Sequence, residues 1–102
     1  MTKQTEDRVA CRTPAGNGGT SNIPVWKYDL LCAAIRDVLA EAGADGMANK
    51  DLRDAVGAKV SAQDLDRLGK LGWHVVTVKL EMEVRGEIAR LPVKGPMRIA
   101  LT

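Results

Sequence analysis

The sequence predicts a small α+β domain, mostly α, in which three main helices precede a C-terminal two-stranded hairpin. Apolar residues recur at spacings of three and four from Val25 to Ala42, which is the pattern of an amphipathic helix. A second long run, Gly72 to Arg85, stops at Gly86, where a helix favours a left-handed C-cap. Two short alternating runs then flank a loop rich in proline and glycine, as in a hairpin.

The composition indicates one domain with an aliphatic core. The chain has 102 residues and is 45% apolar, with two Trp, one Tyr and no Phe. No apolar run approaches the roughly 20 residues that cross a bilayer, and the N-terminus lacks the apolar segment of a signal peptide. The two cysteines, Cys11 and Cys32, are expected to be reduced thiols. We therefore expect a soluble cytoplasmic protein that does not enter a membrane.

The N-terminal residues 1–22 are predicted to be a disordered tail. They are polar and finish in the glycine-rich stretch Gly16–Asn22, so they offer little apolar surface to offset the entropy of ordering. The folded domain is therefore predicted to span residues 23–102. Its first helix is predicted over 25–42, with Pro24 in the first turn and Gly43 after the end.

Shorter elements are expected between the two long helices. Met47-Ala48 can supply a short strand, and Asn49 is a good N-cap for a second helix over 49–56. Further on, Ser61 and Asp64 resemble a capping box, which predicts a short helical turn near 62–68.

The run after Gly72 supports two interpretations. Apolar and polar residues alternate from Val76 to Val84, as in a half-buried strand, and this alternative gives a meander of 75–85, 87–91 and 97–101. The run is longer than a typical strand of ~5–6 residues, which favours a helix over 72–85.

As a helix, this run has two apolar faces. One face can pack on the first helix. The second face needs cover from the C-terminal hairpin and the turn near Leu65, or from a second chain. The first face comprises Val75, Val78 and Met82, and the second comprises Trp73, Val76, Leu80 and Val84.

The junction from Met82 to Arg90 resembles that of winged helix-turn-helix domains, in which a recognition helix ends at a glycine and passes into a two-stranded wing. The run Trp73-x-Val75-x-Thr77-Val78-x-Leu80 is also similar to that of an uncharacterised bacterial family of this fold, a domain of unknown function. The junction implies a winged helix-turn-helix domain with its wing at 87–101, and the similarity to the uncharacterised family implies no activity. The long link between the second and third main helices departs from an ordinary winged helix.

DNA binding is the function that this resemblance implies, in a transcription-regulator-like module acting on double-stranded DNA. Residues 59–102 hold eight basic and five acidic side chains, whereas residues 23–58 hold four basic and six acidic. A recognition helix would read bases and a wing would contact phosphates. Glu81 on the same face, and the lack of an arginine in the N-terminal half of that helix, argue against this function. The expected contacts are Lys70, His74 and Thr77 on the helix and Arg90, Lys94 and Arg98 on the wing.

An enzyme is not expected. The single histidine, His74, has no orienting partner nearby in sequence, and no glycine-rich stretch matches a phosphate loop. The two cysteines lack metal-ligand spacing, so no catalytic residue, cofactor, metal or small-molecule substrate is predicted. The alternative function is a protein-interaction or dimerisation module with a winged-helix fold, which would form a homodimer through Trp73, Val76, Leu80 and Val84.

Overall fold

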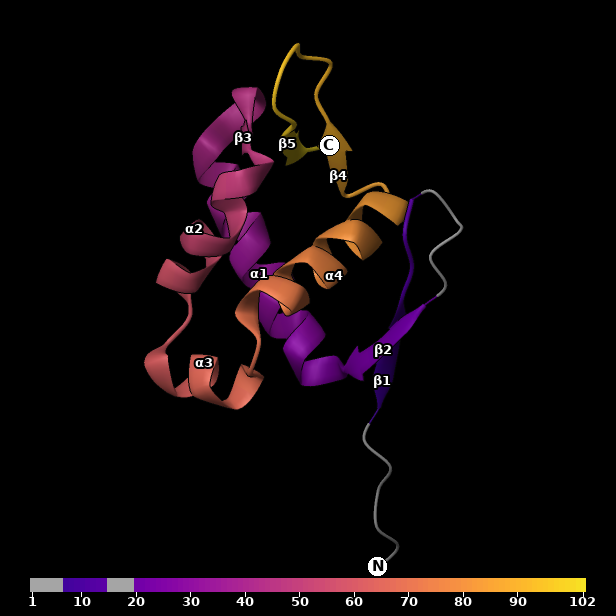
Figure 1. Ribbon diagram of the computed structural model, residues 1–102, viewed down its shortest axis with the longest axis vertical. Coiled ribbons are helices and arrows are strands. Elements are labelled where there is room, and N and C mark those ends of the chain that lie inside the picture. The colour runs from indigo at the N-terminus through magenta and orange to yellow at the C-terminus, as the bar shows by residue number, and fades with distance from the viewer. Residues whose placement is uncertain (1–6, 15–19) are drawn as a thin grey trace, which may run out of the picture.

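The computed structural model describes residues 7–14 and 20–102. Figure 1 shows α4 crossing α1, a three-stranded sheet at one end of the helices and a separate two-stranded hairpin beside α4. The helices are α1 (Val25–Ala42), α2 (Leu52–Lys59), α3 (Ala62–Leu68) and α4 (Leu71–Val84), with short 3-10 helices η1 (Gly43–Asp45) and η2 (Asn49–Asp51). The strands are β1 (Arg8–Cys11), β2 (Ser21–Pro24), β3 (Met47–Ala48), β4 (Ile88–Arg90) and β5 (Arg98–Leu101).

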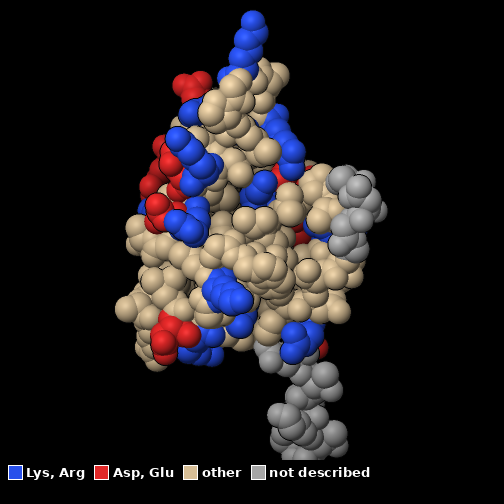
Figure 2. Space-filling model, in the orientation of Figure 1, with Lys and Arg blue, Asp and Glu red and all other residues tan. Residues whose placement is uncertain are grey.

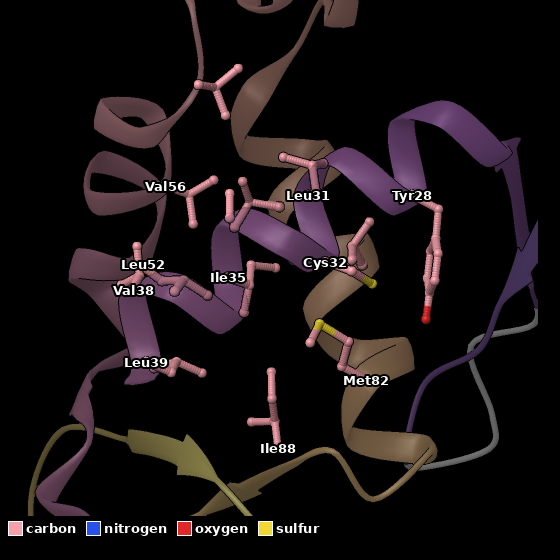
Figure 3. Packing of buried hydrophobic residues seen from close by; sticks show 14 of the residues in the cluster. Tyr28, Leu31, Cys32, Ile35, Val38, Leu39, Leu52, Val56, Met82 and Ile88 are labelled. Carbon is pink, nitrogen blue, oxygen red and sulfur yellow. The ribbon is translucent and has the colours of Figure 1, made fainter. Parts of the chain in front are cut away.

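Helix α1 is the centre of the core. Its apolar face meets α2 on one side and α4 on the other, as the three- and four-residue spacing predicts. Figure 3 shows Leu31, Ile35, Val38 and Leu39 of α1 pointing toward side chains of α2, α4 and β4. Those partners include Leu52 and Val56 of α2, Met82 of α4 and Ile88 of β4.

The predicted small, mostly helical α+β class is confirmed, and helices or strands are present in each segment predicted between residues 25 and 101. The first helix and the turn at 62–68 have the predicted bounds, and the second main helix starts with η2 and extends to Lys59. The run after Gly72 is a helix, so the meander with a strand at 75–85 is wrong. The alternation was misleading because two of its polar members, Lys79 and Glu81, are buried against charged partners rather than exposed to solvent.

The C-terminal sheet has the order β3-β5-β4, with both pairs antiparallel. Its central strand places Ile99 fully in the core. Gly46 lies just before β3 with φ 65°, and a Cβ there would stand 2.0 Å from the carbonyl oxygen of Ile99. Only glycine allows the chain to approach β5 this closely.

The prediction of a disordered tail over residues 1–22 is wrong for the part that the structure describes. β1 and β2 form an antiparallel hairpin in which Val9 pairs with Ile23 and Cys11 with Ser21. Cys11 and Ile23 are both buried in the common core, and β1 packs against α1 and α4. The apolar surface that orders this segment therefore belongs to distant helices, which is why its own composition did not reveal it. Residues 1–6 and 15–19 of the predicted tail lie outside the described residues.

Candidate functional site

The outward face of α4 carries an apolar stripe formed by Trp73, Val76, Leu80 and Val84, called here the α4 stripe. Trp73 is 48% exposed and Val76 is 51% exposed, whereas Leu80 and Val84 are half-buried. The opposite face of the helix, with Val75, Val78 and Met82, is buried against the core. The two apolar faces predicted from the sequence are thus real, and only one of them is fully covered.

The N-terminal hairpin borders one flank of the α4 stripe. Thr77 and Leu80 share a hollow of about 210 Å³ with Arg12, Thr13 and Ser21 of the hairpin region. The N-terminal hairpin therefore provides part of the cover of this face, which was not among the expected sources of cover.

A buried carboxylate, Glu81, fastens this hairpin to α4. Its Oε1 accepts from the backbone N–H of Arg12 at 2.7 Å, and its Oε2 accepts from the Arg12 guanidinium and from Nε of Arg85, also at 2.7 Å. The side chain of Glu81 is 0% exposed. The Arg12 hydrogen bonds, with help from Arg85, lower the pKa of Glu81 from 4.5 to about 2 against the opposing effect of burial. We call these three residues the Glu81 ion cluster. Sequence patterns do not reveal the contact between Arg12 and Glu81, because the two residues lie 69 positions apart in the chain.

A second ionic network joins α4 to β4. Lys79 Nζ lies 2.7 Å from Glu83 Oε2, and Arg90 Nε lies 2.6 Å from Glu83 Oε1. The Lys79–Glu83 pair is almost fully buried, so its charges compensate each other inside the protein.

The structure does not bring the six expected DNA contacts together into one free basic surface. Arg90 is paired with Glu83, and Arg98 donates to the backbone carbonyls of Asp45 and Gly46 at 3.2 and 3.1 Å. His74 is 8% exposed, with Nδ1 2.6 Å from the carbonyl oxygen of Lys70.

The other three expected contacts lie apart from these. Thr77 is half-buried beside the hairpin. Lys70 and Lys94 are exposed, and neither has an acidic partner among residues 7–14 and 20–102. Figure 2 shows basic side chains spread over the visible face from the loop between β4 and β5 downward, with acidic ones gathered mainly at one margin.

The described part of the chain contains no group of three or more His, Cys, Asp or Glu side chains that could hold a metal ion. Within the same residues, no helix combines the length and hydrophobicity that a membrane span requires.

One protein family matches this chain over residues 8–99, and its description is "Family of unknown function (DUF6958)". The chain belongs to this family. The match runs from the start of β1 to Ile99 in β5, so it includes the N-terminal hairpin and the helices. Comparisons with curated proteins and with solved structures found no match.

Proposed function

We propose that this DUF6958 domain is a protein-interaction module that self-associates through the α4 stripe. The observation that carries the proposal is the exposure of Trp73 and Val76. They are two of the three large hydrophobic side chains that are exposed among the described residues, and they lie about one turn apart on a single helix. Contiguous exposed apolar surface with a polar rim is typical of an interaction site.

The spacing within the stripe favours a helix as its partner. Positions 73, 76, 80 and 84 follow one another at intervals of three and four residues, so they form a straight ridge that packs against another helix. A two-fold axis through the ridge would pair it with the same ridge of a second copy. With the two α4 helices antiparallel, Trp73 of one copy faces Val84 of the other, and the bulky end of each stripe meets the small end.

The size of the α4 stripe sets the expected affinity of self-association. A half-exposed tryptophan offers about 100 Å² of apolar surface, whereas a stable interface buries about 800 Å² on each partner. The stripe therefore supplies the apolar centre, and surfaces beside it supply the remainder. We expect a dissociation constant in the micromolar range.

The winged-helix arrangement is part of this proposal. Three main helices, α1, α2 and α4, are followed directly by the two strands β4 and β5, and the short strand β3 joins their sheet. This order supports a winged helix with α3 as an additional helix between the second and third main helices.

Sedimentation velocity from about 5 to 500 μM protein tests self-association, a range that brackets the expected affinity. Val76→Glu places a carboxylate near the centre of the proposed interface in both copies, and we expect it to weaken dimerisation at least about tenfold. Val93→Glu is the matched control, because Val93 is 44% exposed but lies in the wing loop. A monomeric wild-type protein at the highest concentration, or equal dimerisation of both variants, would refute the proposal.

DNA binding is the second candidate, and the free lysines Lys70 and Lys94 favour it. Neither side chain is neutralised by an acidic group in the described part of the chain, and Lys94 lies in the wing loop. Anisotropy of a labelled random duplex at low and near-physiological salt tests this function. We expect Lys70→Ala with Lys94→Ala to reduce the salt slope by about two. A wild-type protein that does not bind the duplex at low salt would exclude it.

A further inference from the structure

We propose that the groove between α2 and α4 binds a small apolar carboxylate, such as an arylalkanoate. The groove has a volume of about 370 Å³, which lies within the roughly 300–1,000 Å³ of small-molecule sites. It lies on the flank of α4 opposite to the hairpin hollow, with Val76 on the ridge between the two. Its lining residues are Asn49, Lys50, Leu52, Arg53, Gly72, Val75, Val76 and Lys79.

Leu52, Val75 and Val76 supply apolar lining to the groove. Leu52 of α2 and Val75 of α4 are each 2% exposed and form the joint between the helices, whereas Val76 stands at the outer edge. Gly72 leaves space between α4 and α2, because a side chain at this position would already contact Arg53 through its Cβ, at 3.4 Å from Cδ of Arg53. This space between two apolar walls suits a single ring or a short alkyl chain.

The charged side chains that line the groove are all cationic. They are Lys50, Arg53 and Lys79, and none of the lining residues is acidic. Lys79 is already paired with Glu83, so Lys50 and Arg53 supply the positive charge available to a ligand. The Arg53 Nε lies 3.3 Å from Asp54 Oδ1, but both side chains are well exposed, and such a pair is weak enough for a ligand carboxylate to replace. A guanidinium presents paired donors that match a carboxylate.

Together, the apolar and the cationic lining residues select an amphipathic anion. The apolar body would lie against Leu52, Val75 and Val76, and the carboxylate would lie between Lys50 and Arg53. The volume is small for a folded peptide, which needs several successive pockets along a groove.

This inference does not rest on self-association, although Val76 borders both surfaces. Titrations with the full chain and with the full chain carrying Leu80→Glu separate the two proposals. Leu80 belongs to the α4 stripe but not to the groove lining. Loss of dimerisation with unchanged ligand binding would leave the groove proposal intact.

The test is a ¹⁵N NMR titration of the full chain with 4-phenylbutyrate and, as the neutral counterpart, 4-phenylbutan-1-ol. We expect the acid to shift the amide signals around Leu52, Arg53, Gly72 and Val75, and to bind about fivefold or more tightly than the alcohol. Larger shifts outside the groove, or equal affinities of acid and alcohol, would overturn the proposal.

Two sets of variants sharpen the result. Lys50→Ala with Arg53→Ala should abolish the preference for the acid, whereas Lys70→Ala with Lys94→Ala removes the same charge outside the groove and should retain it. Gly72→Leu should fill the groove and block both ligands. If the control pair abolishes the preference equally, the selectivity is a property of net charge and the assigned site is wrong.

Discussion

Replacing Glu81 by glutamine tests how strongly the ion cluster holds the N-terminal hairpin. The substitution keeps the shape of the side chain but removes the charge that Arg12 and Arg85 contact. A carboxyl whose pKa falls from 4.5 to about 2 on folding stabilises the folded state by about 3 kcal/mol at neutral pH. The two arginine side chains are 54% and 42% exposed, and solvent screening reduces the expected effect to about 2 kcal/mol.

The pH dependence follows from the direction of this shift. Because the pKa of Glu81 is lower in the folded state, its contribution is complete above pH 4.5 and is lost as the pH falls toward 2. The difference in unfolding free energy between wild type and Glu81→Gln should therefore be about 2 kcal/mol at pH 7, about half of that near pH 3, and smaller still near pH 2.

Urea denaturation at pH 7, 4 and 3, followed by circular dichroism, measures these differences. Glu87→Gln is the control, because Glu87 is also paired with an arginine, Arg36, but both side chains are partly exposed. The control should cost less than about 1 kcal/mol. A difference for Glu81→Gln that is no larger than the control, or that does not change between pH 7 and pH 3, would refute the reasoning.

Two further predictions concern local backbone requirements. Gly46→Ala should destabilise the fold by more than about 2 kcal/mol, because φ is positive there and the new Cβ would overlap the carbonyl oxygen of Ile99. Gly43→Ala should cost only about 1 kcal/mol, because φ is also positive but the space around it is open. Thermal unfolding of the two variants compares these costs. Ser61→Ala should cost about 1 kcal/mol in urea denaturation by removing the hydroxyl that accepts from the N–H of Asp64 at the start of α3, and an unchanged midpoint would show that this cap is energetically neutral.

The main helices could be predicted because their signals are local. The three- and four-residue spacing in α1 reflects burial on one side, and Gly86 ends the last helix in the left-handed conformation with φ 77°. The outward α4 stripe was also predictable, because helical periodicity alone separates Trp73 and Val76 from the buried face.

The features that escaped prediction depend on partners distant in sequence. Arg90 and Arg98 were expected to contact DNA, but Arg90 donates to Glu83 and Arg98 donates to two backbone carbonyls. A sequence shows that a side chain is charged but does not show its partner. The groove likewise joins residues of η2 and α2 to residues of α4, and the whole of α3 lies between these segments in the sequence. Side-chain pairing of this kind exists only after the helices have packed.

The contact between Arg12 and Glu81 also constrains the order in which the protein folds. It closes a loop of 69 residues, and the surface that holds β1 lies on α4. During synthesis, β1 therefore emerges long before the surface that holds it. Closing so long a loop costs entropy that only a preformed helical core can offset. We expect the hairpin to dock after the main folding transition, so the ion cluster should slow unfolding while leaving the folding rate almost unchanged.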